Sequence, residues 1–164
     1  MCVKVYVEIC RESAILPSYA NPGDAGMDVY AAEDINIMPG ETVIVPTGLK
    51  LAIPQGYEIQ VRPRSGISLK TPLRIPNTPG TIDSGYRDEL GIIISNTSPV
   101  SGSNSQEVFS INSTGNKFGT YKIKKGDRIA QIVLQAVPRI EFSIVNSVEE
   151  IGDNRGGGFG STGV

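Results

Sequence analysis

The chain has 164 residues and a net charge of −2, with 39% hydrophobic and 20% charged residues. This length and balance fit one globular domain, and they argue against a disordered chain or a protein that coats nucleic acid. Histidine is absent, which excludes His-dependent triads, imidazole acid–base chemistry and His-ligated metals. The two cysteines are too few for a cysteine-only zinc site or a disulfide framework.

The aliphatic composition favours β-structure. The chain has 20 isoleucines and 14 valines against 7 leucines and 8 alanines. β-Branched side chains suit pleated sheets, whereas leucine and alanine favour helices. Glycine (19) and proline (11) are abundant and indicate many turns. We therefore expect an all-β protein with few helices.

Short apolar segments recur about every ten residues, separated by glycine and proline. Residues 3–9 alternate apolar and polar side chains, which predicts a half-buried strand. One short helical turn fits residues 66–70. This spacing is typical of a sandwich or barrel. The further predicted strands lie at residues 28–31, 42–46, 48–53, 57–61, 91–95, 121–123, 128–136 and 140–145.

Two segments depart from this pattern. Residues 98–119 are rich in Ser, Asn and Gly, which predicts a long loop or hairpin excursion. Residues 154–164 are rich in glycine and cannot bury enough area to order alone. We therefore expect one β domain over residues 1–153, with 98–119 as an insertion and 154–164 as a flexible arm.

The sequence gives no sign of export or of a membrane partner. Lys4 and Glu8 interrupt the apolar core that a signal peptide needs. No apolar run approaches the roughly 18 residues that cross a bilayer. We therefore expect a cytoplasmic location, where Cys2 and Cys10 would stay reduced.

Five polar, glycine-containing segments interrupt the strands, at residues 24–28, 62–66, 77–87, 125–131 and 155–163. The first could hold a hydrated divalent ion through Asp28, although a solvated turn is the commoner interpretation. The second has two arginines, a serine and a glycine, which can cradle phosphate. An exposed basic turn is an equally open interpretation of that segment.

The third segment offers a candidate base. Ile82 is expected in the core and would hold Asp83 at a fixed angle. An ionised carboxylate can accept a proton from water, although Asp83 could also be only a turn former. Tyr86 alone would more often be a packing residue than a ligand platform.

The last two segments suggest further ligand contacts. Gly126-Asp127 indicates a hairpin turn, but Gln131 lies in an otherwise apolar strand, where its amide needs a partner. In the fifth segment, glycines would let backbone amides approach an anion, and a phenylalanine offers a ring face for a base. A disordered tail is the usual alternative for such a terminus.

In order and spacing, the five segments together resemble the five motifs of the homotrimeric deoxyuridine triphosphatases (dUTPases). The resemblance covers nearly the whole chain, from about Val3 to Gly163. The matching stretches are residues 25–28 (AGMD), 63–66 (PRSG), 80–87 (GTIDSGYR), 126–131 (GDRIAQ) and 155–163 (RGGGFGSTG).

The resemblance implies a jelly-roll-like β-barrel that forms a homotrimer, with an exchanged C-terminal arm that closes each active site. It implies Mg²⁺-dependent hydrolysis of dUTP to dUMP and pyrophosphate, with water attacking the α-phosphorus. That reaction limits uracil in DNA and supplies dUMP for thymidylate synthesis.

Carried over by position, the resemblance makes Asp83 the catalytic base and gives Asp28 the role of holding Mg²⁺ through water. Tyr86 would pack under the deoxyribose. The implied substrate-binding residues are Arg64, Ser65, Gly66 and Gln131 at the phosphates, Asn77, Gly80 and Ile82 at the uracil, Tyr86 at the sugar, and Arg155, Phe159, Gly160, Ser161 and Thr162 on the arm.

Two other functions stay open from the sequence. A dCTP deaminase of the same superfamily would share the barrel, but its third motif usually has tryptophan at the position of Tyr86, and this chain has none. A dUTP-dependent regulatory protein would bind a protein partner through residues 98–119.

Asp88 stands where the third motif usually has glycine, and we expect a local change of turn there without loss of activity.

Overall fold

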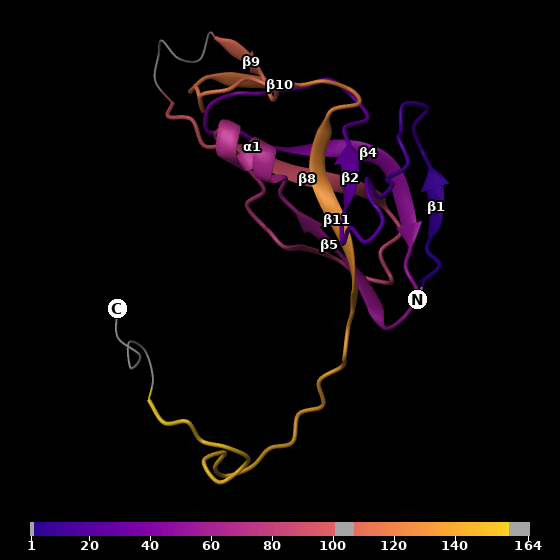
Figure 1. Ribbon diagram of the computed structural model, residues 1–164, viewed down its shortest axis with the longest axis vertical. Helices are drawn as coiled ribbons and strands as arrows, with labels where there is room; N and C mark the ends of the chain where they lie inside the picture. The colour runs from indigo at the N-terminus through magenta and orange to yellow at the C-terminus, as the bar shows by residue number, and fades with distance from the viewer. Residues whose placement is uncertain (1, 101–106, 158–164) are drawn as a thin grey trace.

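The computed structural model describes residues 2–100 and 107–157, and β-strands dominate it (Figure 1). One short helix, α1, accompanies the strands in this part of the chain. The predicted all-β class is therefore confirmed. The elements are β1 (Tyr6–Ile9), β2 (Met27–Tyr30), β3 (Ile35–Ile37), β4 (Thr42–Ala52), β5 (Tyr57–Arg62), α1 (Ser65–Lys70), β6 (Leu73–Arg74), β7 (Gly80–Ile82), β8 (Glu89–Asn96), β9 (Val108–Ser110), β10 (Thr120–Ile123) and β11 (Arg128–Ala136).

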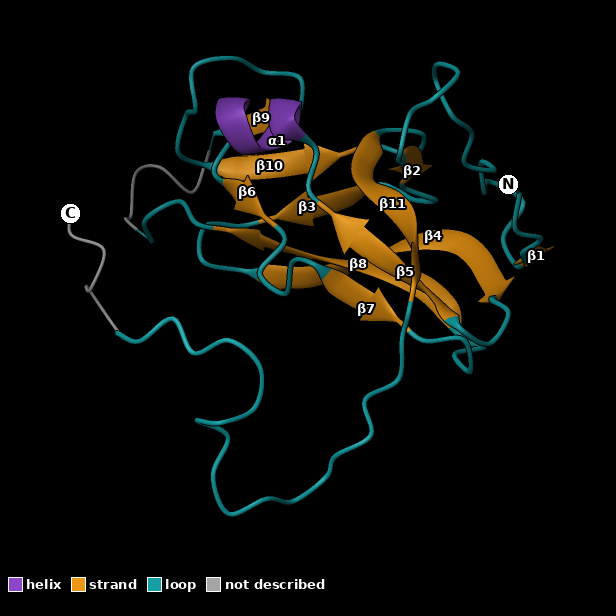
Figure 2. Cartoon of the chain, turned by 60° about the horizontal axis from the view of Figure 1, so that its bottom comes forward, coloured by secondary structure: helices purple, strands orange, loops and turns teal. Residues whose placement is uncertain are grey.

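The strands form two four-stranded sheets and one three-stranded sheet (Figure 2). Their orders are β1-β4-β8-β6, β2-β11-β5-β7 and β3-β10-β9. The two strands predicted at 42–46 and 48–53 are a single strand, β4, whose register shifts between Pro46 and Lys50. Gly48 lies in that irregularity with φ at +74°, a backbone conformation that glycine adopts without strain.

All three sheets contribute to one hydrophobic core. On β8 the burial alternates strictly, so that Leu90, Ile92 and Ile94 face inward. Such alternation is expected for a strand with one face on the core. Tyr121 on β10 is fully buried in the same core, and its ring lies 5.7 Å from that of Phe109 on β9. The third sheet is therefore an integral part of the barrel.

Part of the predicted excursion at 98–119 is anchored. β9 pairs in parallel with β10, so it is not one arm of an antiparallel hairpin. The buried Asn96 side chain donates to the backbone oxygens of Ile37 and Gly119, at 2.9 and 2.8 Å. These bonds hold the point where the segment leaves the barrel next to the point where it returns. Residues 101–106 are outside the described part.

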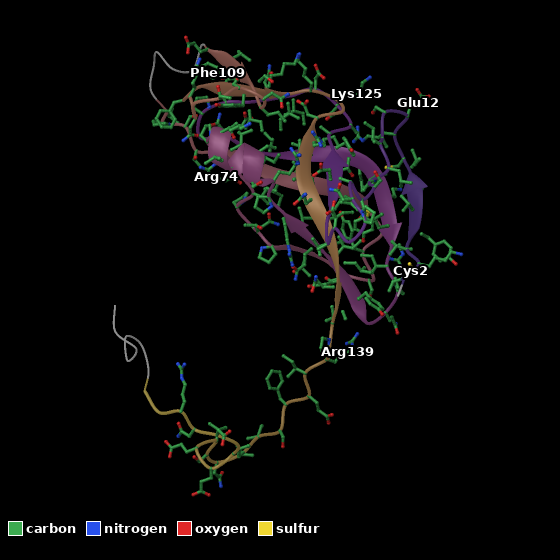
Figure 3. All side chains as sticks on the ribbon, viewed as in Figure 1. Cys2, Glu12, Arg74, Phe109, Lys125 and Arg139 are labelled. Carbon is green, nitrogen blue, oxygen red and sulfur yellow. The ribbon has the colours of Figure 1, made fainter. Side chains whose placement is uncertain are left out.

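The strand predicted at residues 140–145 is wrong. The chain leaves the barrel after β11, and no strand or helix occurs in residues 137–157 (Figures 1 and 3). Phe142 and Ile144 are 87% and 99% exposed. The apolar alternation is present, but the segment pairs with no strand in residues 2–100 and 107–157. The domain boundary at residue 153 stays a prediction. No described helix is long and apolar enough to span a bilayer.

Candidate functional site

Three of the five motifs meet at one end of the sheet β2-β11-β5-β7. Gln131 on β11 lies opposite Asp28 on β2 and opposite Arg62 on β5. This register brings the start of β11 beside Arg64, which follows β5 by two residues. The sequence alone could not show this, because Asp28 and Gln131 are 103 residues apart.

Asp28 is the centre of a charged cluster formed by Asp28, Arg64, Arg128 and Gln131. Its Oδ1 accepts from Arg64 Nε at 2.9 Å and from Gln131 Nε2 at 3.3 Å. Its Oδ2 accepts from Arg64 Nη2 at 3.3 Å and from Arg128 Nη1 at 3.2 Å. The partner expected for the Gln131 amide is therefore Asp28. We call this set the Asp28 cluster.

The Asp28 cluster can attract an anion. It contains two guanidinium groups and one carboxylate, which leaves a net positive charge. Asp28 and Arg64 are 15% and 25% exposed, while Arg128 is 55% exposed. Partial burial strengthens charge–charge contacts relative to water, and guanidinium forks match phosphate oxygens. Arg128 was not among the predicted site residues, although it lies within the fourth motif.

Ser65 and Gly66 open α1 directly after Arg64, and both are exposed. Arg64 has extended backbone angles at the N-cap, and its side chain makes no capping bond. Its guanidinium is thus free to turn toward Asp28. A Cβ placed at Gly66 would meet no heavy atom within 4 Å, so the surface in front of this turn is open.

The third motif forms a separate group around β7. Gly80 pairs with Val61 and Ile82 pairs with Ile59, which joins β7 to the edge of the same sheet. A Cβ at position 80 would lie 3.3 Å from Val61 Cβ and 3.2 Å from Asn77 Nδ2. Asn77 therefore lies against the Gly80 backbone, and the uracil contacts expected of both residues stay a prediction.

Asp83 and Tyr86 follow β7 on one tight turn. The Tyr86 N–H donates to the Asp83 carbonyl at 3.1 Å, and both side chains are exposed. Ile82, partly buried against the core, anchors the start of the turn as predicted. Arg87 Nη1 donates to the carbonyls of Ser84 and Tyr86 at 2.7 and 2.8 Å, which fixes the turn further. Asp83 is thus an accessible carboxylate on a constrained backbone.

One chain does not bring the two groups together. In residues 2–100 and 107–157, no hydrogen bond or ion pair joins Asp83 or Tyr86 to the Asp28 cluster. Gly80 pairs with Val61 at the end of β7 that is nearer to the Asp28 cluster. Asp83 follows the opposite end of β7. Arg155 lies exposed on the extended C-terminal segment. Phe159, Gly160, Ser161 and Thr162 lie outside the described residues.

The described carboxylates do not form a direct metal cage. No group of three or more Cys, Asp or Glu side chains able to hold an ion occurs in the described part of the chain. Asp28 already accepts from Arg64, Arg128 and Gln131. These contacts suit a cation that arrives on a polyanionic ligand and keeps its own waters, as Mg²⁺ does.

The Asp28 cluster should make stability depend on pH. Burial tends to raise the pKa of Asp28, but the Arg64 hydrogen bond and charge, the Gln131 hydrogen bond and the Arg128 charge outweigh burial and lower it. A lowered native pKa stabilises the fold above the ordinary carboxyl pKa of about 4, and this stability is lost as pH falls through the native value.

Thermal melts should therefore show Asp28→Asn less stable than wild type at pH 7 and less sensitive to acid. Equal slopes between about pH 5 and 2 would contradict this.

Comparisons with known proteins identify the family. The dUTPase family model matches residues 12–102 and 103–163. The deoxyuridine 5′-triphosphate nucleotidohydrolase of Gloeothece citriformis is 42% identical over 99% of this chain and 98% of its own. That of Fusobacterium nucleatum is 44% identical over 98% of each.

Solved structures are also similar. The Staphylococcus bacteriophage 80alpha dUTPase with dUpNHpp has a TM-score of 0.83 and 32% identity, over 98% of this chain and 99% of its own. A mutant dUTPase from phage phi11 of S. aureus, described as coordinating a structural Mg(II) ion, has a TM-score of 0.80 and 33% identity, over 89% of this chain and 99% of its own. The predicted jelly-roll-like dUTPase fold is confirmed.

Proposed function

The chain belongs to the dUTPase family, and we propose that it hydrolyses dUTP to dUMP and pyrophosphate. The observation that carries the proposal is the turn after β7, where an exposed carboxylate and an exposed tyrosine lie three residues apart on a fixed backbone. The proposed general base, Asp83, and the proposed deoxyribose contact, Tyr86, therefore lie in one short segment. This reaction would limit uracil in DNA and supply dUMP for thymidylate synthesis.

In the proposed reaction Asp83 is the general base. Its carboxylate takes a proton from a water, and the water oxygen bonds to the α-phosphorus. The bond from that phosphorus to the bridging oxygen breaks, and pyrophosphate leaves with the electron pair. A positioned base of this kind contributes about 10²–10⁴ in rate. Tyr86 would pack under the deoxyribose, where a 2′-hydroxyl would clash.

The phosphates and the uracil would bind two different groups of residues. Arg64, Ser65, Gly66 and Gln131 would contact phosphate oxygens, an assignment that the exposed start of α1 and the net charge of the Asp28 cluster support. The uracil edge would face Asn77 and the hairpin backbone at Gly80 and Ile82. That backbone would offer peptide donors and acceptors to the uracil edge and would exclude a 5-methyl group.

Mg²⁺ would enter with the triphosphate. Asp28 would hold it through water, which its existing hydrogen bonds allow more readily than direct ligation. The ion would supply positive charge that offsets the charge of the leaving pyrophosphate. The arginine side chains would orient the triphosphate.

We also propose that the protein works as a homotrimer in the cytoplasm. The separation of Asp83 and Tyr86 from the Asp28 cluster supports sites completed by other subunits. The exposed apolar segment after β11 supports an exchanged arm. The arm residues Arg155, Phe159, Gly160, Ser161 and Thr162 would then close over a bound nucleotide.

The test is pyrophosphate release by the wild-type protein with Mg²⁺, using dUTP, UTP, dCTP and dTTP in parallel. We expect release from dUTP to exceed release from the other three by at least about 100-fold. The dCTP amino group would leave polar groups of the uracil site unpaired, whereas UTP and dTTP would clash through the 2′-hydroxyl and the 5-methyl group. Ammonia release from dCTP would instead identify a deaminase. Equal release from all four would contradict a dUTP-specific site.

A second role as a regulatory protein binder through residues 98–119 also stays a proposal. Its support is that this segment has exposed apolar side chains, since Val100 and Val108 are 83% and 58% exposed. A phage 80alpha dUTPase that is 32% identical to this chain is described as controlling transfer of virulence genes by a G protein-like mechanism. Replacing residues 101–106 by a short glycine linker should leave dUTP turnover intact while removing partner capture. Loss of turnover would assign the segment to the enzyme instead.

A further inference from the structure

We infer that Arg11 is a positioning residue that holds Tyr86 in place through Glu89, and so contributes to the choice of deoxyribose over ribose. This inference rests on the proposed function, because it assigns Tyr86 to the sugar. Arg11 lies outside all five motifs. It belongs to the segment between β1 and β2, far in sequence from the third motif.

Arg11 and Glu89 form a two-pronged ion pair. Arg11 Nε donates to Glu89 Oε1 at 2.7 Å, and Arg11 Nη2 donates to Glu89 Oε2 at 2.9 Å. A parallel pair of this kind fixes orientation as well as distance. The third arm of the guanidinium, Nη1, donates to Glu33 Oε2 at 3.3 Å. Glu33 thus binds Arg11, whereas the Tyr86 hydroxyl bonds to Glu89.

Glu89 fills the irregularity in β4. The regular pairing of β4 with β8 is interrupted between Pro46 and Lys50, and Lys50 lies opposite Glu89 where the pairing resumes. The Gly48 N–H lies within that interruption and donates to Glu89 Oε1 at 2.8 Å. The Glu89 carboxylate therefore replaces the backbone partner that an uninterrupted ladder would have supplied.

The same residue holds the tyrosine. The Tyr86 hydroxyl donates to the Glu89 carbonyl at 2.9 Å. Glu89 is thus fixed through its side chain by Arg11 and Gly48, while its carbonyl fixes the far end of the Tyr86 ring. Because Tyr86 is 39% exposed, packing covers its ring only in part, and this hydrogen bond fixes its hydroxyl end.

The pair remains charged under assay conditions. The Arg11 hydrogen bond lowers the pKa of Glu89 against the opposing effect of burial, and the Gly48 N–H and the charges of Arg11 and Lys50 lower it further. Arg11 is 40% exposed and Glu89 is 25% exposed. Ion pairs this exposed add little to overall stability. The main consequence of losing Arg11 is therefore a misplaced Tyr86 rather than an unfolded protein.

The experiment compares Arg11→Gln with Glu33→Gln as a matched control. The control removes the other carboxylate of Arg11 and leaves the bonds to Glu89 intact. The readout is kcat/KM for dUTP divided by kcat/KM for UTP. We expect Arg11→Gln to lower this ratio by about 10-fold, since small displacements of a positioning group cost up to about 100-fold. Glu33→Gln should keep the wild-type ratio.

A double-mutant cycle with Tyr86→Phe tests whether Arg11 acts through the hydrogen bond between Glu89 and the Tyr86 hydroxyl. Phenylalanine removes the hydroxyl that donates to the Glu89 carbonyl, so Arg11→Gln should have no further effect on the ratio in that background. Arg11→Lys keeps the charge but not the two-pronged geometry, and it should lie between wild type and Arg11→Gln. An unchanged ratio in Arg11→Gln, or an equal loss with and without the Tyr86 hydroxyl, would overturn the inference. A wild-type protein inactive on dUTP would instead overturn the proposed function.

Discussion

Replacing Asp83 by asparagine should lower kcat for dUTP hydrolysis by about 10²–10⁴-fold, the usual contribution of a positioned general base. Asparagine has nearly the same shape, but its amide cannot take the proton of the attacking water. The backbone of the turn should be unaffected, because the Asp83 atom that bonds to Tyr86 is the main-chain carbonyl. Affinity for dUTP should be retained or improved, since a negative charge near the triphosphate is removed.

The measurement is single-turnover pyrophosphate release together with dUTP binding by calorimetry. Asp88→Asn is the matched control, because Asp88 is an exposed aspartate five residues further along the same loop. It removes the same charge from the same surface, and its kcat should stay close to wild type. A similar loss of kcat in both variants would mean that charge near the loop matters, and Asp83 would no longer be the base.

The strands that the sequence predicted are those with strong alternation or a dense apolar run. β8 and β11 are examples, because their side chains alternate or cluster in a way that only a core-facing strand explains. β3, β6, β7 and β9 were not predicted, since two or three residues are too few to show a period. Their existence depends on neighbouring strands that the chain supplies from elsewhere.

The motifs of the site could be predicted, but their arrangement could not. Asp28, Arg64 and Gln131 were predicted as separate contacts, and the register of β2, β11 and β5 brings them into one cluster. Arg128 could be assigned to the cluster only from the structure, because a surface arginine beside a hairpin turn has no distinctive sequence pattern. The same holds for Arg11 and Glu89, which meet across 78 residues of sequence. Pairings of this kind follow from topology rather than from local sequence.

Replacing Phe142 and Ile144 together by aspartate should prevent assembly. Both side chains are almost fully exposed in a single chain, and residues 140–145 alternate like a strand that has lost its partner. Burial of each side chain against another subunit would contribute about 1.5–3 kcal/mol. Losing both should weaken association by about 10²–10⁴-fold for each arm. Light scattering coupled to gel filtration should then report a monomer at concentrations where the wild type forms the proposed trimer.

Turnover should fall with assembly, because Asp83 and Tyr86 are not joined to the Asp28 cluster within the described part of one chain. Val108→Asp provides the control, since Val108 is also exposed but lies on β9, away from the segment after β11. It should leave both the mass in solution and the turnover of dUTP unchanged. A double variant that stays trimeric would show that other surfaces hold the assembly. One that is monomeric yet fully active would show that a single chain completes its own site, and the sharing of sites between subunits would be wrong.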